Sequence, residues 1–385
     1  MKNTFKILFL AAIANFASFA GAADNRPELR ILNPSPLSGL VKDTGTQQAQ
    51  AIEKGLAYLS TNSKYKVVYK AVDDKFDPTV ALQVIPEAVE TFNPHAVVGL
   101  FGTPNVQKLV ETKFFEKYKI PMIGSRTGAT SGVHNEYTHH LRASFEDEIQ
   151  TYLKTTAGSG IKKVGLLYVN NPFGLEGLNA IKDYTRKNSK PTDPVLVDSA
   201  SHPKETTDVK AAVDQLMAQD INVIVLMTTT APAREAMKQI YEASLKKKKS
   251  LWVLSISSID PAGLQLDKLN MKAKKPWVVF SSIVPNDADE FQSSRSVMNE
   301  YSDFLKVSGL VRSTSTLEGF LIAKTTMAAA EKVEAPMTRE KLQAVLTNLQ
   351  VKLSVIHQYN TKFKRASDRV YFNYYDPETK KLVPM

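Results

Sequence analysis

The sequence predicts an α/β protein of two doubly wound lobes, each built on a parallel sheet, joined by a hinge of several strands. From Glu28 onward, short runs rich in β-branched residues alternate with longer stretches of helical periodicity, a pattern typical of βαβ units. The alternation pauses between Ile123 and Leu141 and then resumes. This pause indicates two successive sheets rather than one continuous sheet.

The expected strands are short apolar runs bounded by turn-forming residues. They are Leu29–Asn33, Lys66–Val72, Ala96–Phe101, Pro121–Gly124, Lys163–Tyr168, Val195–Ser199, Val223–Met227, Leu251–Ser255 and Trp277–Ser281. The helices expected between them lie near residues 43–62, 79–91, 104–118, 146–158, 173–188, 206–219 and 230–246.

The last third of the chain loses the alternation. Helices are expected near 287–307, 314–332 and 338–348, followed by a strand-rich tail from Leu353 to Met385. Helices without strands of their own must cover a sheet already made, so we expect the chain to return to the first lobe. The first lobe is then residues 24–141 with about 285–352, and the second is 142–284 with about 353–385.

Residues 1–22 have the features of a secretory signal peptide. A basic start is followed by the apolar run Ile7 to Phe19 and by Ala20-Gly21-Ala22, a small-residue cleavage site. Later apolar runs such as Val223–Met227 have strand length, too short for a membrane span. The chain has no cysteine, which excludes a disulfide framework, a thiolate metal site and a lipid-modified cysteine anchor. We expect a secreted, periplasmic protein that is not lipid-anchored.

The formal net charge of +10 raises the question of nucleic-acid binding. The one dense basic cluster, Lys246 to Lys249, lies at the end of an expected helix, where cations favour the helix dipole. Aromatic residues are not interleaved with it, as a base-stacking surface requires. We expect no nucleic-acid partner.

The loops that follow the strands define a candidate binding site, because ligands of open parallel sheets lie beyond the carboxyl ends of the strands. These loops are rich in hydroxyl groups and small residues, with one arginine, which suits an anion or a carboxylate. Candidate residues of the first lobe are Ser38, Thr103, Pro104, Ser125, Arg126, Thr127, Gly128 and Ala129. Those of the second lobe are Asn171, Phe173, Thr229 and Ser257. For any single residue, helix capping or a turn is the alternative interpretation.

Several segments carry a family resemblance by their order and spacing. They are Ser35 to Gly39, Asp73-Asp74 through Asp77-Pro78 with Ala81, Val97 to Pro104, Ile120 to Ile123, Leu141 to Phe145, Lys163-Val164-Gly165 through Asn171 to Gly174, and Glu318-Gly319-Phe320. Over almost the whole mature chain they resemble the type I periplasmic binding proteins of ABC importers, in the branched-chain amino acid (leucine-binding-protein-like) group.

The resemblance implies roles for some of these positions. Thr103 and Thr127 resemble first-lobe donors to a ligand carboxylate, and Phe173 lies where the family often has an aromatic residue from the second lobe. Thr229 and Ser257 belong to strand-end loops that complete the second-lobe face.

Two departures from the family pattern bear on the ligand. Amino-acid-binding members have an acidic residue after the strand equivalent to Leu251–Ser255, where this chain has Ser-Ile-Ser-Ser-Ile before Asp260. Arg126 adds a cation where relatives more often have an apolar residue. If its side chain points inward, it favours an anionic ligand without an amino group.

The sequence lacks the motifs of the enzyme classes considered. No Gly-x-Ser-x-Gly elbow, dinucleotide fingerprint or phosphate loop occurs. His139 and His140 are adjacent on a strand and point to opposite faces, so they are poorly placed to chelate one ion. The pair Asp73-Asp74 and the cluster Glu146 to Glu148 are interpreted as helix caps or solvent-facing groups. We expect no catalytic residues, metal or cofactor.

The predicted function is that of a monomeric solute receptor that closes around a small carboxylate-bearing molecule and delivers it to an inner-membrane ABC permease. Two alternatives remain open. One is amino acid binding for uptake, branched-chain or other. The other is a sensor of the same fold that reports ligand occupancy to a membrane partner.

Overall fold

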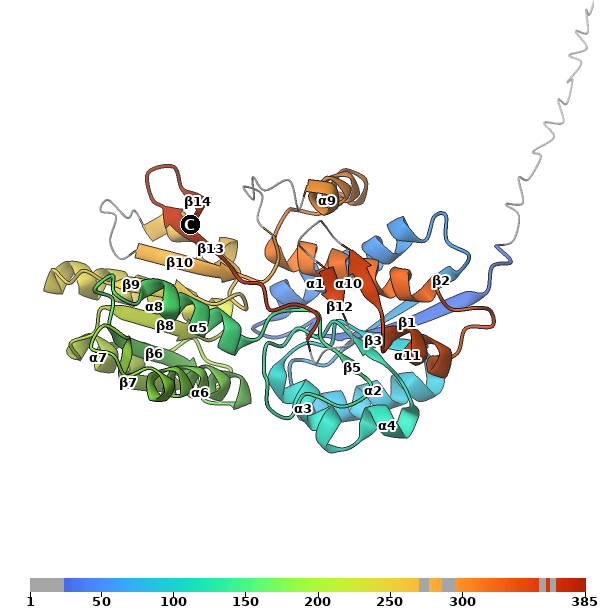
Figure 1. The fold of residues 1–385 in the computed structure, drawn as a ribbon, viewed down its shortest axis with the longest axis horizontal. Helices are drawn as coiled ribbons and strands as arrows, with labels where there is room; N and C mark the ends of the chain where they lie inside the picture. Colours follow the sequence, from blue (N-terminus) through green and yellow to red (C-terminus); the bar gives the residue numbers. More distant parts are fainter. Residues whose placement is uncertain (1–23, 270–276, 286–294, 353–357, 361–364) are drawn as a thin grey trace, which may run out of the picture.

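The computed structural model describes residues 24–269, 277–285, 295–352, 358–360 and 365–385. The signal peptide expected at 1–22 lies outside the described residues, as does the start of the helix expected near 287–307. Two sheets lie in separate lobes side by side (Figure 1). The predicted fold class, two doubly wound α/β lobes, is confirmed.

The first sheet is parallel throughout. Its strands are β1 (Glu28–Ser35), β2 (Lys66–Asp73), β3 (Ala96–Val98), β4 (Met122–Ile123) and β5 (Thr138–His139), in the order β2-β1-β3-β4-β5. Its helices are α1 (Lys42–Leu59), α2 (Pro78–Phe92), α3 (Thr103–Glu111), α4 (Phe114–Tyr118), α9 (Arg295–Ser308), α10 (Thr314–Ala330) and α11 (Arg339–Leu346).

Both faces of this sheet are covered, as the strand sequences require. Successive strand residues point to opposite faces, and both members of the pair Ile31 and Leu32 are fully buried. Ile31 packs into the core under α1, α9, α10 and α11, whereas Leu32 packs into the core under α2, α3 and α4. The C-terminal helices therefore cover the first sheet, and in Figure 1 they lie beside the N-terminal strands.

The second sheet carries the remaining long strands. They are β6 (Lys163–Val169), β7 (Val195–His202), β8 (Val223–Met227), β9 (Trp252–Ser255), β10 (Trp277–Ser282), β13 (Tyr371–Asp376) and β14 (Lys381–Pro384), in the order β14-β13-β10-β9-β8-β6-β7. Around it lie α5 (Phe145–Thr156), α6 (Pro172–Lys187), α7 (Lys210–Ala218), α8 (Thr230–Lys247), and the 3₁₀ turns η1 (Ala262–Leu264) and η2 (Leu266–Leu269). A separate two-stranded sheet pairs β11 (Gln350–Lys352) with β12 (Gln358–Asn360).

The second sheet is not parallel throughout. Strands β13 and β14 are joined by a short turn and add to β10 as an antiparallel hairpin. A parallel pair needs a long crossover, which the end of the chain does not provide between these strands. The strand-rich tail thus closes one edge of the second sheet.

Two connections between the lobes run side by side at the hinge. His140 pairs with Arg365 as a parallel bridge, and the Ala366 amide donates to the His140 carbonyl over 2.8 Å. The Arg365 side chain donates to the carbonyls of Thr127, Ala129 and Arg142. The hinge is therefore held by backbone pairing and by one arginine that serves several carbonyls.

Local predictions were wrong at two places in the first lobe. The helix expected near 104–118 divides into α3 and α4, because Lys113 adopts a φ of +54° between them. The segment between Ile123 and Leu141, where no strand was expected, contains the two-residue strand β5, which pairs with β4 at the edge of the sheet. So short a strand leaves almost no periodicity in the sequence.

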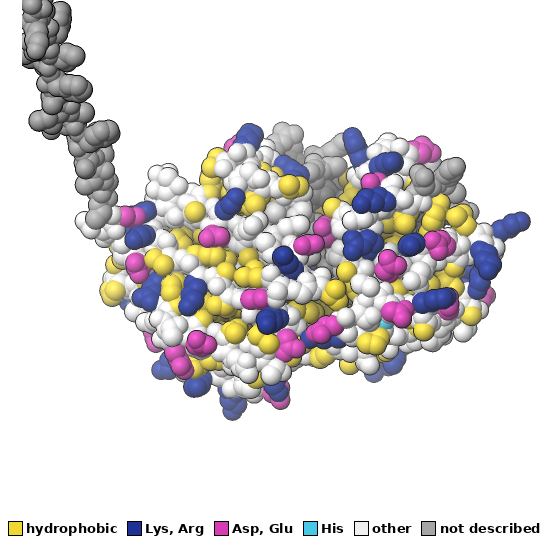
Figure 2. Space-filling model, turned by 180° about the vertical axis from the view of Figure 1, so that it is seen from behind, with side chains coloured by type: hydrophobic (Ala, Val, Ile, Leu, Met, Phe, Trp, Pro, Cys, Tyr) yellow, Lys and Arg dark blue, Asp and Glu magenta, His cyan; other side chains and the backbone are white. Residues whose placement is uncertain are grey.

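On the face shown in Figure 2, Lys and Arg side chains are interspersed with Asp and Glu over both lobes. The described residues of this face form no continuous basic surface of the kind that binds nucleic acid. Among the described helices, none combines the length and apolarity needed to cross a bilayer.

We expect substitutions at Gly319 to destabilise the first lobe, because α10 packs there directly against α1. A Cβ at Gly319 would lie 2.7 Å from the Ala51 Cβ and 2.9 Å from the Gln48 carbonyl oxygen. Replacing glycine with alanine inside a helix normally stabilises the helix by up to ~1 kcal/mol. Here the steric cost of packing the new methyl group against α1 exceeds that gain. Gly319→Ala should lower the free energy of unfolding by ~1 kcal/mol, and Gly319→Val by more, in urea titrations. A more stable Ala variant would contradict this close contact.

Candidate functional site

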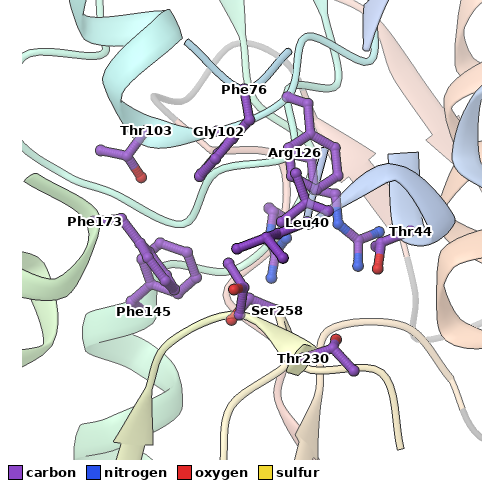
Figure 3. Close-up of a pocket in the computed structure, with 14 residues that line it drawn as sticks. Leu40, Thr44, Phe76, Gly102, Thr103, Arg126, Phe145, Phe173, Thr230 and Ser258 are labelled. Carbon is purple, nitrogen blue, oxygen red and sulfur yellow. The ribbon is translucent and has the colours of Figure 1, made fainter. Parts of the chain in front are cut away.

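A cavity lies between the carboxyl ends of the strands of the two lobes (Figure 3). The empty space that it encloses, with its mouth included, is about 490 Å³. Its apolar lining residues are Leu40, Val41, Phe76, Phe101, Phe145 and Phe173. The others are Thr44, Gly102, Thr103, Arg126, Arg142, Thr229, Thr230 and Ser258.

Four phenylalanines form two edge-to-face pairs around this cavity. Phe76 and Phe101 of the first lobe have ring centroids 5.8 Å apart, and Phe145 and Phe173 have centroids 5.1 Å apart. Phe145 and Phe173 occupy the first turns of α5 and α6, whose N-termini face the cavity (Figure 3). Aromatic pairs of this geometry provide rigid apolar walls for a ligand.

The loop after β2 brings Phe76 into the cavity. Lys75 and Phe76 both have a positive φ, of +52° and +57°. The carboxylate of Asp73 accepts from the Lys75 amide over 3.0 Å, and that of Asp74 accepts from the Phe76 amide over 2.9 Å. Interpreting Asp73 and Asp74 as helix caps or solvent-facing groups was wrong, because their carboxylates bind this strained loop.

Gly102 leaves room for the Phe76 ring to pack against the loop that follows β3. Its φ is +93°, and a Cβ there would lie 2.2 Å from the Phe76 ring. The Gly102 amide also donates to the Arg126 carbonyl over 3.2 Å, which joins the loops after β3 and β4. A residue with a side chain would displace Phe76 from the cavity.

Two arginines that line the cavity and two glutamates behind them form a buried ionic chain. Arg126 Nη1 donates to Glu318 Oε2 over 2.8 Å, and Arg142 lies 3.5 Å from both Glu318 and Glu148. All four residues are less than one-tenth exposed. Burial lowers the pKa of Arg126, and the Glu318 carboxylate opposes this shift. The chain links α10 of the first lobe to α5 of the second through Arg142.

Glu148 ends this chain inside the second lobe. Its carboxylate accepts from the Ser257 amide (2.8 Å), the Ser257 hydroxyl (2.6 Å) and the Ser281 hydroxyl (2.5 Å), while Ser257 also accepts from Arg142. The expectation that the cluster Glu146 to Glu148 caps a helix or faces water holds for Asp147, which completes the capping box of α5. It is wrong for Glu148, which is fully buried.

Two predicted threonines of the first lobe bond to each other. The hydroxyls of Thr103 and Thr127 lie 2.7 Å apart, and Thr127 accepts from the Ala129 amide over 3.1 Å. Thr103 lines the cavity, whereas Thr127 supports it from behind. Thr103 is thus the threonine placed to reach a ligand.

Other predicted residues have structural partners outside the cavity lining. Ser38 donates to Asp73 over 2.6 Å, and the Ser125 hydroxyl lies 2.6 Å from His140 Nδ1. Pro104 is near the start of α3. Gly128 packs under the Phe145 ring, where a Cβ would lie 2.7 Å from it. Ser38 and Ser125 thus join neighbouring loops and Gly128 allows close packing, and none of these residues lines the cavity.

In the second lobe, Phe173 and Thr229 line the cavity, and Ser258 takes the place expected for Ser257. Asn171 caps α6 by accepting from the Gly174 amide over 3.1 Å, and it lines an adjoining chamber. Asp260 lies outside the lining and accepts from the Ala262 amide over 3.2 Å. It does not replace an acidic partner in the cavity.

The lobes also contact each other through polar residues outside the cavity lining. Lys204 of the second lobe forms an ion pair with Asp77 of the first over 3.3 Å. Glu176 on α6 accepts from the amide and hydroxyl of Thr130 and from the Ser131 amide, each over 3.1 Å. These polar contacts hold the lobes closed over the cavity.

His139 and His140 have hydrogen-bond partners within the protein. His139 Nε2 lies 2.9 Å from Gln343 Oε1, and His140 contacts Ser125 and the Val133 carbonyl. Among the described residues no group of three His, Cys, Asp or Glu side chains is placed to hold a metal ion.

Residues 28–378 match the family model described as periplasmic binding protein. The chain belongs to this family. The match confirms the resemblance to type I periplasmic binding proteins, and the solved structures of similar fold include a branched-chain amino acid ABC transporter protein. No curated protein sequence matches this chain.

Several solved periplasmic binding proteins share the fold. One is a substrate-binding periplasmic protein from Ralstonia solanacearum, with 22% identity, a TM-score of 0.83, and coverage of 93% of this chain and 100% of that one. Another is a branched-chain amino acid ABC transporter protein from Thermus thermophilus with bound valine, with 14% identity, a TM-score of 0.76 and coverages of 94% and 96%. A third is an ABC transporter solute binding protein from Rhodopseudomonas palustris in complex with 3,4-dihydroxy benzoic acid, with 16% identity, a TM-score of 0.75 and coverages of 93% and 96%.

Of the apolar residues that line the cavity, only Phe173 was among the residues predicted from the sequence. Phe76 follows β2, so the rule that ligands lie beyond strand ends would have found it had that loop been included. Phe145 and Arg142 follow the last short strand of the first lobe, which the sequence did not reveal. Leu40 lies just before α1 and Thr44 lies in its first turn, and no sequence signal marks either as a lining residue.

We expect Glu318→Gln to destabilise the protein strongly, because it removes the carboxylate that two buried arginines share. Breaking a buried ion pair from one side costs ~3–5 kcal/mol. Asp303→Asn is the matched control, since Asp303 pairs with Lys306 on the surface and such pairs contribute less than ~1 kcal/mol. Urea unfolding of both variants measures the difference. Equal, small losses would show that the ionic chain contributes little.

The buried carboxyl of Asp74 should make stability depend on pH. Burial raises its pKa to about 7 from 3.8, although the Phe76 amide opposes the shift. Folding therefore favours the protonated acid, and this stabilisation is present at low pH and lost as the pH rises through about 7. In Asp74→Asn, the free energy of unfolding should fall less between pH ~4 and ~7, by on the order of 1 kcal/mol or more. An unchanged pH profile of urea unfolding would contradict this assignment.

Proposed function

We propose that this periplasmic binding protein is the solute-binding component of an ABC transporter and that its ligand is a small organic acid with an apolar body. One observation carries the choice of ligand. Among the described residues that line the cavity, two are arginines and none is Asp or Glu. The carboxylates that neutralise these arginines lie behind them, outside the lining.

Arg126 has the donors to bind a carboxylate. Its Nη1 is engaged by Glu318, while its Nε and Nη2 form no hydrogen bond with the described residues. A guanidinium presents parallel N–H groups that match the two oxygens of a carboxylate. The Thr103 hydroxyl lines the same cavity and provides a further donor. The ion pair with Glu318 therefore orients Arg126 without using all of its donors.

The four phenylalanines favour an apolar or aromatic body on this acid. Burial of apolar ligand surface against them stabilises the complex by ~25 cal/mol per Å². The aromatic acid bound by the similar protein from Rhodopseudomonas palustris supports this ligand class.

An amino acid is the alternative, supported by the valine of the Thermus thermophilus protein. Its ammonium group needs acceptors, and an ammonium buried without a carboxylate is costly. The cavity lining described here offers hydroxyl groups but no carboxylate. This favours an acid without an amino group.

The proposed partner is an inner-membrane ABC permease that receives the ligand from the monomeric protein. The contacts of Lys204 with Asp77 and of Glu176 with Thr130 join the two lobes across the cavity. Such contacts form only when the lobes close, which supports a protein that presents one closed form to its partner when loaded.

Benzoate, phenylacetate and 3-phenylpropionate should raise the melting temperature, and their neutral amides should not. Arg126→Lys retains a cation beside Glu318 but loses the planar fork, so affinity for a stabilising acid should fall at least ~10-fold in calorimetric titration. Thr103→Ala should weaken binding by ~1 kcal/mol.

Arg186→Lys is the matched control, because Arg186 is exposed on α6 and pairs with Asp183. Its affinity should equal that of the wild type. Stabilisation by L-phenylalanine but by none of the three acids would replace the proposed ligand with an amino acid. Equal affinity of Arg126→Lys and the wild type would remove Arg126 from the binding site.

A further inference from the structure

A second chamber opens beside the cavity, between the same two lobes. It measures about 650 Å³ with its mouth included, and it shares Leu40, Val41, Phe76 and Thr229 with the first cavity. These four side chains form the boundary between the two spaces. A ligand held in the cavity therefore lies next to the chamber, across a boundary that is largely apolar.

The chamber contains an amide donor without a partner. Asn171 Oδ1 accepts from the Gly174 amide over 3.1 Å, which fixes the orientation of the side-chain amide. Asn171 Nδ2 is buried and donates to no described residue. A buried N–H group without an acceptor is destabilising, so an acceptor supplied by a ligand would be favoured there.

Two lysines place positive charge at the chamber. Lys75 is exposed at its rim, and its Nζ forms no ion pair or hydrogen bond with the described residues, although its charge lowers the pKa of Asp73. Lys204 is shared between Asp77 over 3.3 Å and Glu205 over 3.2 Å. The charge of Lys204 is thus compensated, and Lys75 is the cation available to an anionic group.

His202 contributes no charge to the chamber. Its Nδ1 lies 2.8 Å from the Pro203 carbonyl and its Nε2 lies 2.7 Å from the Thr228 hydroxyl. Burial lowers its pKa, so the imidazole is neutral at neutral pH. The Glu205 carboxylate also lines the chamber and is paired with Lys204. Asn171 Nδ2 and the Lys75 ammonium are lining donors that form no hydrogen bond or ion pair with the described residues.

We propose that the chamber binds a second carboxylate at the far end of the ligand, which makes this protein a receptor for two-ended organic acids with an apolar middle. The inference rests on the proposed function, because it requires the first carboxylate to lie in the cavity at Arg126. The apolar middle of the ligand passes between Leu40 and Phe76, and the second carboxylate accepts from Asn171 Nδ2 and pairs with Lys75.

Matched acids test this proposal by calorimetric titration. Each set consists of three acids that differ only at the ring position para to the group that bears the first carboxylate. This position carries a hydrogen, a methyl group or a second carboxylate. The sets are built on benzoate, phenylacetate and 3-phenylpropionate, so that the distance between the two ends varies. In at least one set, we expect the dicarboxylate to bind at least ~10-fold tighter than the methyl compound, although the carboxylate is the more costly group to desolvate.

Two variants locate the second group. Asn171→Asp keeps the oxygen that caps α6 but replaces the donor with an acceptor, and Lys75→Met removes the cation. Each should abolish the advantage of the dicarboxylate and leave the affinity for the monocarboxylates unchanged. Lys248→Met is the matched control, because Lys248 is exposed at the end of α8 with a φ of +51°, close to the +52° of Lys75.

The outcomes separate this proposal from the proposed function. If monocarboxylates bind but no dicarboxylate binds tighter, the chamber is not a carboxylate site and the proposed function stands. Retention of the dicarboxylate advantage in both variants would also overturn the chamber site. If none of the acids binds, both proposals fail.

Discussion

The buried ionic chain of Arg126, Glu318, Arg142 and Glu148 is the interaction on which the site depends. It begins in the loop after β4, passes through α10, and ends at Glu148 on α5 in the second lobe. Charges removed from water are tolerated only when each has a partner, so the four side chains constrain one another. The two arginines consequently face the cavity in fixed positions, while their counter-charges lie behind them. This arrangement makes the hinge side of the cavity a polar wall of defined geometry.

The rest of the cavity is apolar, and its shape depends on backbone held by polar groups. The positive φ values at Lys75 and Phe76 are maintained by the carboxylates of Asp73 and Asp74, and Gly102 leaves room for the Phe76 ring. Strained backbone near a ligand site persists only where surrounding contacts support it. Polar and apolar walls together suit the proposed ligand, an acid with an apolar body.

Much of the fold followed from the sequence, and so did part of the site. Periodicity placed the long strands and helices, since buried parallel strands are continuous apolar runs. The strand-end rule identified Thr103, Arg126, Phe173 and Thr229, all of which line the cavity. The same rule selected Ser38 and Ser125, whose hydroxyls are used by Asp73 and His140. A hydroxyl at a strand end can serve a ligand or a neighbouring loop, and only the distances between side chains distinguish the two.

By itself, the sequence determined the order of βα units, the division into two lobes and the family, because these depend on local periodicity and on motifs read along the chain. The tertiary structure alone decided the electrostatics of the site. Arg126 suggested an anion because it was an isolated cation in the sequence, whereas in the fold Glu318 lies beside it from a helix far along the chain. In the sequence, Glu148 is one of several carboxylates in an acidic cluster. In the fold, it is distinguished from the others because the hydroxyls of Ser257 and Ser281 donate to it. Charge pairing depends on contacts between residues distant in sequence, and these arise only when each lobe has folded. The cavity lining also requires the two lobes to meet, because it takes residues from both.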